Sequence, residues 1–292
     1  MSPRLPLVFI LTLTTLISVS ARMQTAGSVQ AQASPTRIAV KSGSVTLEAW
    51  MWRPQGSGPF PAVLVNHGSG RTREELKRLG PYERLAETIG PVFARHGYVL
   101  LYLFRRGVGP SINLGDNAIE QMNEAAATHG QDARNALQMK LLEGSEMSDA
   151  VAALTRLRQL PDVDPLRVAL IGHSFGGSLT VLMCEHEPSL RAAVIFSVGG
   201  YSWDRSADLR GRLLQAIQRT SVPMFFIHAA NDYSLNPGKA LDLELARLGK
   251  PHRLKIYPPV GQTVEDGHAF PNNSVATWEP DVFAFLDPYM RK

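Results

Sequence analysis

The chain has 292 residues, of which 44% are hydrophobic and 19% charged, and its formal net charge is +4. This composition is typical of a globular protein and excludes collagen-like and intrinsically disordered chains. The basic residues do not gather into a block of the kind that nucleic-acid-binding proteins use, so we expect no nucleic-acid partner. The single cysteine, Cys184, cannot form an intramolecular disulfide, so the fold must depend on its core.

The N-terminal segment resembles an export signal. Arg4 precedes an apolar run from Leu5 to Val19. This run is shorter than the about 20 residues that a membrane-spanning helix needs. Small residues follow it, and Ala31 and Ala33 form the Ala-x-Ala pattern that signal peptidases cut.

We therefore expect residues 1–33 to be a signal peptide and residues 34–292 to be the mature domain. A cut near Ala21 and an uncleaved anchor are the alternatives. The expected location is periplasmic or secreted, with no membrane contact after cleavage.

Strand-like segments recur along the rest of the chain. The first alternates polar and apolar residues, as an edge strand with one wet face does. The others are short and mostly apolar, which indicates strands buried on both faces. The predicted strands are Ser44–Trp52, Pro61–His67, Tyr98–Phe104, Arg167–Gly172, Ala192–Val198, Pro223–Ala229 and His252–Pro258.

Helical patterns lie between these strands. In the one at 82–97, Gly90 and Pro91 should kink or split the helix. Alternating strands and helices predict a mainly parallel sheet with helices on both faces. Such sheets bind ligands at the carboxyl ends of their strands, so functional residues should follow the strands directly. The other predicted helices cover 147–159, 177–187, 207–219 and 238–248.

Residues 105–146 interrupt this alternation with two short helical patterns. An insertion that follows the carboxyl end of a strand lies over the site, so we interpret this segment as a partial lid. The alternative is a surface helix pair without a gating role.

A serine lies at a sharp corner in "GHSFG", residues Gly172 to Gly176. A strand-like segment precedes this Gly-x-Ser-x-Gly pattern and a helix-like segment follows it, which is the context of a nucleophile elbow. The glycines are needed because side chains there would collide with the neighbouring strand and helix. The sequence thus predicts Ser174 as a nucleophile, whereas a glycine-rich packing turn is the alternative.

A nucleophilic serine needs a base, and the base needs an acid that orients it. Of the eight histidines, His268 follows the last predicted strand in a loop and can reach over the sheet. Asp232 follows the strand before it and is the predicted acid. Glu265 and Asp266 are rivals, but they lie too close to His268 in sequence to orient it easily.

An oxyanion hole needs two backbone N–H groups. Phe175 follows the nucleophile and supplies the first. The loop "VNHGSG" supplies the second, from Ser69 or, as the next choice, Gly70, while His67 braces the loop.

These motifs together resemble the α/β-hydrolase superfamily, and within it the dienelactone hydrolase and prolyl-oligopeptidase-like branch. The stretches "NHGSG", "GHSFGG", "NDY" and "DGHAF" carry the resemblance across residues 66–270. It implies an eight-stranded, mostly parallel sheet and a hydrolytic triad that needs no cofactor. Dienelactone hydrolases proper use a cysteine nucleophile, so the serine at position 174 favours ordinary ester cleavage over lactone cleavage.

The expected activity is that of a serine carboxylesterase acting on small, short-acyl esters. The candidate substrate contacts follow predicted strands and are Arg105, Tyr201 and Tyr233. The alternative for Arg105 is an exposed loop residue that contacts the lid and not the substrate. Cys184 and His186 lie two positions apart on a predicted helix, so their side chains project from different sides of it. We therefore expect no metal site there. A peptidase or amidase, or a binding protein without catalysis, are the alternatives. The sequence gives no prediction of the oligomeric state.

Overall fold

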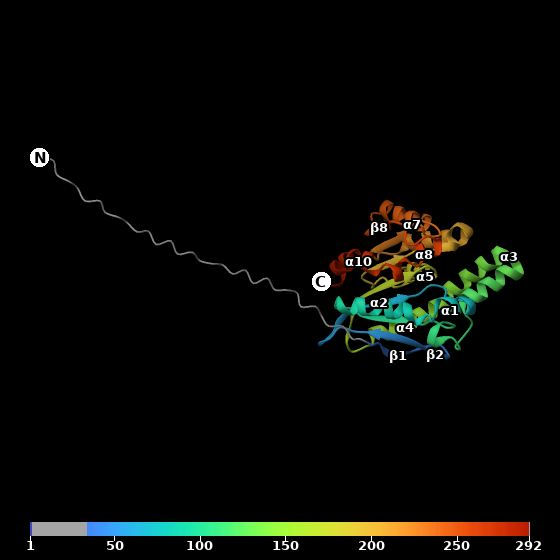
Figure 1. Cartoon of the computed structure of the whole chain (residues 1–292), viewed down its shortest axis with the longest axis horizontal. Coiled ribbons are helices and arrows are strands. Elements are labelled where there is room, and N and C mark those ends of the chain that lie inside the picture. Colours follow the sequence, from blue (N-terminus) through green and yellow to red (C-terminus); the bar gives the residue numbers. More distant parts are fainter. Residues whose placement is uncertain (2–33, 292) are drawn as a thin grey trace.

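The computed structural model describes residue 1 and residues 34–291, so the expected signal peptide lies outside the described residues. The described chain contains an eight-stranded sheet in the order β1-β2-β4-β3-β5-β6-β7-β8. In Figure 1, β1 and β2 lie at the lower end of this sheet and β8 at the upper end. Strand β2 runs antiparallel to β1 and β4, and the remaining neighbours are parallel. The expected mostly parallel sheet is therefore confirmed. Its strands are β1 (Thr36–Ser42), β2 (Val45–Trp52), β3 (Phe60–Asn66), β4 (Val99–Leu103), β5 (Val163–His173), β6 (Ala193–Phe196), β7 (Met224–Ala229) and β8 (His252–Tyr257).

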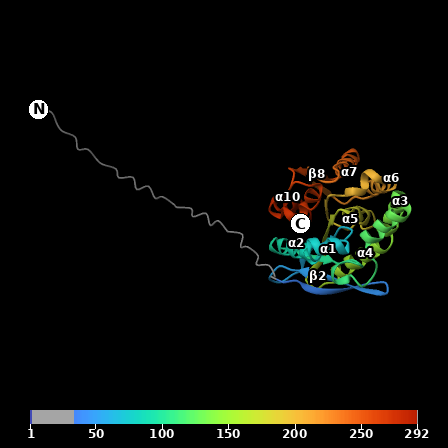
Figure 2. The same ribbon diagram turned by 45° about the vertical axis from the view of Figure 1, so that its right-hand side comes forward.

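Helices cover both faces of the sheet. Figure 2 shows α2 and α10 on one side and α3, α4 and α6 on the other. None of the helices within residues 34–291 has the length and apolar character that crossing a bilayer requires. The α-helices are α1 (Arg73–Leu79), α2 (Glu83–Arg95), α3 (Ala118–Glu143), α4 (Ser145–Arg158), α5 (Phe175–His186), α6 (Ala207–Arg219), α7 (Asn236–Arg247), α8 (Val264–His268), α9 (Phe270–Asn273) and α10 (Val275–Met290); two 3₁₀ helices are η1 (Gly109–Ser111) and η2 (Gly200–Arg205).

Each face of the sheet has its own hydrophobic core. On one face, strand side chains such as Leu64 and Leu170 pack with the apolar stripes of α4, α5, α6 and α7. On the other face, Val63 and Ile171 pack with α2 and α10. Successive residues of β3 and β5 thus enter opposite cores, as the period of two in a strand requires. Burial on both faces explains why these strands are continuously apolar.

The first strand, β1, was not among the seven predicted from the sequence. It pairs with β2 from Thr36 opposite Met51 to Ser42 opposite Val45. Four of its seven side chains are exposed, because it forms the edge of the sheet. A mostly exposed edge strand lacks the apolar run that identifies the inner strands.

Helix α2 is continuous through Pro91, so of the two expected outcomes, a kink or a split, the split is wrong. Proline removes only one helical hydrogen bond, the one to the carbonyl of Glu87 four residues earlier. Glu87 is exposed, so water can bind that carbonyl. Gly90 has a packing role instead, because a Cβ atom at this position would lie 2.1 Å from Cδ2 of the Trp52 indole.

This contact gives a testable prediction. Gly90→Ala should destabilise the fold by about 1–3 kcal/mol, since overpacking against Trp52 outweighs the gain in helix propensity. Gly211→Ala is the matched control: Gly211 also lies within a helix, but a Cβ there meets nothing within 4 Å. The control should stabilise by about 0.5–1 kcal/mol. Urea unfolding of both variants measures the difference, and equal stabilities would contradict the packing argument.

Candidate active site

Ser174 occupies the turn between β5 and α5. Its backbone has φ 57° and ψ −117°, a left-handed conformation that is rare outside glycine, and its N–H donates to the Phe196 carbonyl at 3.0 Å. The neighbouring glycines permit this corner. A Cβ atom at Gly172 would lie 2.5 Å from the Gly176 carbonyl oxygen, and one at Gly176 would lie 2.1 Å from the His67 carbonyl oxygen. The glycines are thus required by backbone contacts, as the sequence argument expected.

Ser174, His268 and Asp232 form a continuous hydrogen-bonded chain. The Ser174 hydroxyl lies 2.8 Å from Nε2 of His268, and Nδ1 of His268 lies 2.7 Å from Oδ1 of Asp232. A carboxylate only accepts, so Nδ1 carries a proton and Nε2 is free to accept from the hydroxyl. The structure therefore brings together all three residues of the expected triad, from 94 and 36 positions apart in sequence.

His268 lies at the end of the short helix α8, and not in a loop as the sequence suggested. Thr263 caps this helix by accepting from the Asp266 N–H, and the Asp266 side chain accepts in return from the Thr263 N–H. This reciprocal capping box is a frequent helix start. It also assigns Asp266, a rival for the acid role, to the helix cap. The exposed neighbour Glu265 contacts the Tyr233 hydroxyl at 3.3 Å instead.

Asp232 is buried and accepts three hydrogen bonds. Its Oδ1 accepts from His268 and from the Tyr233 N–H at 2.8 Å, and its Oδ2 lies 2.8 Å from Nδ1 of His228. Burial alone would raise the pKa of Asp232, but the hydrogen bonds from His228 and His268 hold that pKa well below its usual range. The carboxylate is thus ionised at neutral pH.

His228 and His173 are neighbours of the triad that were not predicted from the sequence. His228 is completely buried, and it lies at the carboxyl end of β7, four residues before Asp232. A polar residue at the end of an otherwise apolar strand was the available signal. Nε2 of His173 donates to the backbone carbonyl of His268 at 2.8 Å, so the residue before the nucleophile fixes the end of α8, which carries the imidazole.

The loop after β3 packs against the elbow. A Cβ atom at Gly68 would lie 3.7 Å from Cβ of Ser174, so the backbone before Ser69 runs directly beside the serine. Phe175 is the first residue of α5, where backbone N–H groups have no partner within the helix. Both expected oxyanion donors, Ser69 and Phe175, therefore belong to segments that flank Ser174.

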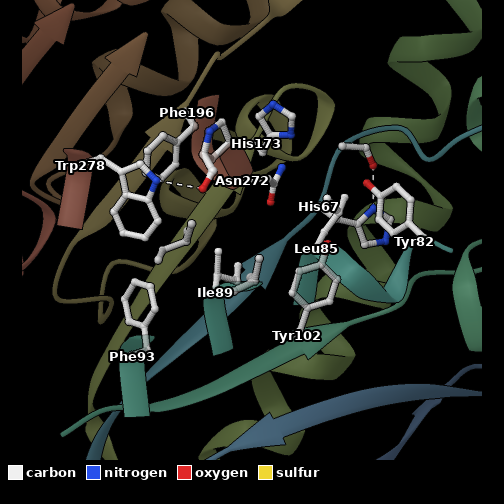
Figure 3. A pocket seen from close by; sticks show the side chains of 14 residues that line it. His67, Tyr82, Leu85, Ile89, Phe93, Tyr102, His173, Phe196, Asn272 and Trp278 are labelled. Atoms are coloured by element: carbon white, nitrogen blue, oxygen red, sulfur yellow. Dashed lines mark hydrogen bonds between the residues drawn. The ribbon is translucent and has the colours of Figure 1, made fainter. Parts of the chain in front are cut away.

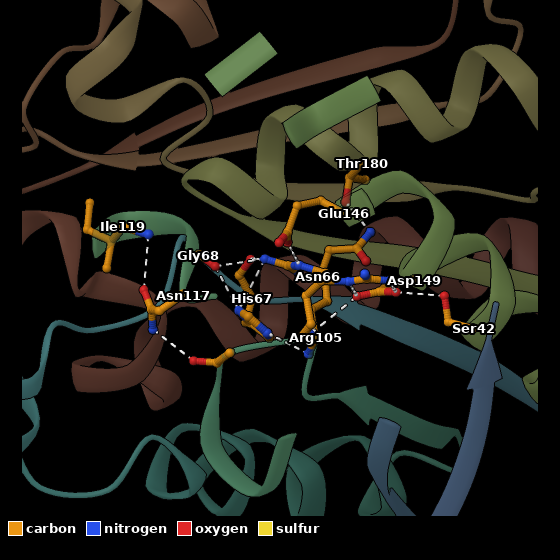
Figure 4. Close-up of polar contacts among 12 residues, drawn as sticks. Ser42, Asn66, His67, Gly68, Arg105, Asn117, Ile119, Glu146, Asp149 and Thr180 are labelled. Carbon is orange, nitrogen blue, oxygen red and sulfur yellow. Dashed lines mark hydrogen bonds and ion pairs between the residues drawn. The ribbon is translucent and has the colours of Figure 1, made fainter. Parts of the chain in front are cut away.

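Arg105 is placed differently from both sequence interpretations. It is 1% exposed and lies under the loop, neither facing the open site nor reaching solvent. Its Nη2 donates to the carbonyls of His67 and Gly68 at 2.8 Å each, and its Nε donates to the buried Glu146 (Figure 4). Arg106 beside it makes a two-pronged ion pair with Asp149. A guanidinium committed to these partners braces the loop from inside the protein.

His67 completes this internal brace. Its Nδ1 donates to the Gly68 carbonyl at 2.7 Å, and its Nε2 accepts from the Arg105 backbone N–H at 3.1 Å. Burial, reinforced by the nearby Arg105 charge, lowers the pKa of His67 well below 6.5. A neutral imidazole is required here, because a second ring proton would displace the Arg105 N–H.

Tyr201 and Tyr233 border the open side of the triad. The Tyr233 ring packs edge-on against His268 with centroids 4.8 Å apart, and Tyr201 packs edge-on against Tyr233 at 6.2 Å. Both remain more than a third exposed. The structure thus keeps these two candidate contacts at the mouth of the site.

The segment 105–146 begins under the site and returns beside it. Its helix α3 has non-helical backbone at Gly130, which separates the two helical stretches that the sequence predicted. The second stretch contacts η2: the Arg134 guanidinium lies 5.0 Å from the Tyr201 ring centroid, and Asn135 donates to the Arg205 carbonyl. A gating role for this segment stays a prediction.

An apolar cavity of about 30 Å³ adjoins the elbow. Its wall includes Gly68, which lies beside Ser174, and His173, which precedes Ser174. Side chains from the sheet, α2, α9 and α10 form most of the remaining wall (Figure 3). The labelled side chains that surround it include Ile89, Phe93 and Trp278. Among residues 34–291, no group of three or more histidine, cysteine or acidic side chains is arranged to hold a metal ion.

The fold and this arrangement of side chains define an α/β-hydrolase. The family model of the dienelactone hydrolase family matches residues 47–282, so the chain belongs to that family. Its members are hydrolases, and the resemblance noted from the motifs is confirmed.

Individual relatives are distant. Esterase EstD of Thermotoga maritima is 28% identical over 132 residues, which are 45% of this chain and 26% of the esterase. The solved dienelactone hydrolase of Anabaena variabilis is 21% identical with a TM-score of 0.58, covering 90% of this chain and 100% of that chain. The acylaminoacyl peptidase of Pyrococcus horikoshii is 17% identical with a TM-score of 0.61, covering 88% and 42%. The two solved structures support the fold alone, and the chain spans less than half the length of three curated relatives that it matches.

The imidazoles of His67 and His173 predict acid sensitivity of the fold. Burial lowers the pKa of His173 from 6.5 to about 3 and that of His67 well below 6.5. Unfolding restores values near 6.5, so below that pH the unfolded chain binds more protons and stability falls as pH falls. Each imidazole should contribute up to about 1.4 kcal/mol per pH unit.

Urea unfolding between pH 7 and pH 4 measures this slope. His173→Gln removes one titrating group and should flatten the slope by about 1.4 kcal/mol per pH unit. An unchanged slope in the variant would show that His173 takes up a proton in the folded state.

Proposed function

We propose that the protein hydrolyses carboxylic esters of small, short-acyl substrates through an acyl-enzyme on Ser174. The observation that carries the proposal is the unbroken chain of hydrogen bonds from the Ser174 hydroxyl through His268 to the buried Asp232. The proton on Nδ1 of His268 leaves Nε2 as the acceptor, which is the tautomer that a general base needs.

In the proposed reaction, Ser174 Oγ attacks the acyl carbon while its proton moves to Nε2 of His268. Asp232 stabilises the imidazolium that forms. Collapse of the tetrahedral intermediate breaks the bond to the alcohol oxygen, which takes the proton from His268. Water then attacks the acyl-enzyme with the same imidazole as base, releasing the acid and restoring the serine.

The backbone N–H groups of Phe175 and Ser69 are the proposed oxyanion donors. The buried Arg105 supports this assignment, because its bonds to the carbonyls of His67 and Gly68 limit rotation of the peptides just before Ser69. A donor that is held before the reaction starts needs no reorganisation when negative charge develops.

The cavity beside the elbow supports a short acyl group. Its volume of about 30 Å³ compares with the roughly 10–15 Å³ that one water molecule needs. Its walls are mostly apolar, so it suits a hydrocarbon end rather than a charged one. Tyr201 and Tyr233, on the exposed side of His268, are the proposed contacts for the alcohol portion.

A p-nitrophenyl ester series of rising chain length tests the proposal. We expect the highest kcat/KM for acetyl to butyryl esters and the loss of turnover in Ser174→Ala. Amides with matched acyl groups separate the peptidase alternative, because a peptidase or amidase should hydrolyse them as well as the esters. Absence of turnover together with failure of a fluorophosphonate to label Ser174 would instead indicate the binding-protein alternative.

Ile89→Ala extends the same experiment to the cavity. Ile89 is 8% exposed and lines the cavity, so truncation should enlarge it. We expect kcat/KM for hexanoyl esters to rise about tenfold relative to acetyl esters. An unchanged chain-length profile would place the acyl group elsewhere.

We also propose that the protein is exported and cut after Ala33, on the strength of the Ala-x-Ala pattern behind the apolar run. N-terminal sequencing of the mature protein from its native host should begin at Ser34. A mature chain that begins at Met1 would refute cleavage.

A further inference from the structure

The carboxylate of Asp232 is held by two imidazoles, and the proposed mechanism uses only one. His268 donates to Oδ1, and His228 lies 2.8 Å from Oδ2 through its Nδ1. The side chains of His228 and Asp232 are both 0% exposed. Because the ionised carboxylate is only an acceptor, Nδ1 of His228 carries the proton and donates.

The other nitrogen of His228 has no partner. Its Nε2 is buried and makes no hydrogen bond to any of the described residues. Whether it is protonated or not, a buried polar atom without a partner costs stability. An apolar side chain would avoid this cost, so the feature that distinguishes histidine at this position is the bond to Asp232.

The imidazole of His228 is also closely confined. A Cβ atom at Gly238 on α7 would lie 2.5 Å from Nε2 and 2.7 Å from Cδ2 of the ring, and 3.3 Å from Leu254 on β8. The ring therefore has no room to swing toward α7, and its Nδ1 proton is presented to Asp232 from a fixed direction.

We infer that His228 is a positioning residue for the proposed hydrolysis: its bond to Oδ2 keeps Oδ1 of Asp232 directed at His268 and draws negative charge away from that oxygen. The inference rests on the proposed function for its catalytic meaning. A carboxylate with one donor fewer binds the proton of the His268 imidazolium more strongly, so His228 lowers the basicity of the general base.

Other groups also face His268. His173, from β5, stays neutral because burial lowers its pKa to about 3. Burial raises the pKa of Tyr233 to about 12, and Glu265 lies beyond the Tyr233 hydroxyl. The rings of His173 and Tyr233 stay neutral near pH 7. A pH shift measured in a His228 variant therefore does not come from a change in their charge.

Two variants at one position separate positioning from packing. His228→Leu fills the space without a donor, whereas His228→Asn places an N–H near the position of Nδ1. For the leucine variant, we expect kcat to fall about tenfold, as for a lost hydrogen bond to a charged group, with KM nearly unchanged. The acid limb of kcat/KM should move up by about half a pH unit. The asparagine variant should recover most of the kcat and the original limb.

A readout that needs no substrate is the NMR titration of His268 in the same proteins. Its midpoint should rise by about half a pH unit in His228→Leu and return in His228→Asn. If the wild type hydrolyses no ester, the proposed function fails, yet this titration still decides whether His228 acts on the Asp232–His268 pair. Thermal unfolding checks that each variant is folded.

A double variant with Asp232→Asn supplies the remaining test. If His228 acts only through the carboxylate, His228→Leu should lower kcat no further in that background. The inference would be overturned if His228→Leu lowered kcat equally in the wild-type and Asp232→Asn backgrounds. An unshifted His268 midpoint in folded His228→Leu would also overturn it. Failure of asparagine to restore the midpoint would do so as well.

Discussion

The backbone of α5 passes so close to the end of β3 that a methyl group at Gly176 would lie 2.1 Å from the carbonyl oxygens of Asn66 and His67. This approach sets the distance between the nucleophile and the loop that follows β3. Any larger residue at Gly176 would push the two segments apart. The strained backbone of Ser174 and the position of the proposed oxyanion donors both depend on it.

Buried polar groups hold the loop after β3 in place. Arg105 and Glu146 form a buried pair under the loop, and the guanidinium also satisfies two backbone carbonyls. An ion pair of this kind is weak evidence for added stability, because desolvation offsets the attraction. Its benefit here is geometric: it fixes backbone groups that would otherwise need water. His228 likewise holds a buried acceptor in place, because its Nδ1 donates to Oδ2 of Asp232.

The sequence was informative wherever function demands a local pattern. The elbow around Ser174 needs glycines at fixed spacing, and the positions of Asp232 and His268 follow from the rule that parallel strands present ligands at their carboxyl ends. Those three residues meet as expected. Inner strands were recognisable because burial on both faces makes them continuously apolar.

The residues that were missed depend on contacts between distant segments. The burial of Arg105 follows from Glu146, 41 positions later, and no local pattern reports that pairing. Strand β1 is polar because it lies at an edge, and α8 is only five residues long. Propensity is weak for such elements, and tertiary packing decides their structure.

Cys184 lies in the middle of this packing, on the helix that begins at the nucleophile. It is 0% exposed, and burial raises the pKa of its thiol well above the ordinary value. Only a thiolate reacts readily with alkylating reagents, so the native thiol is inert. Its modification requires the core packed around α5 to open. The rate at which Cys184 is alkylated therefore reports how often the core beneath the catalytic serine opens. No engineered label is needed for this measurement.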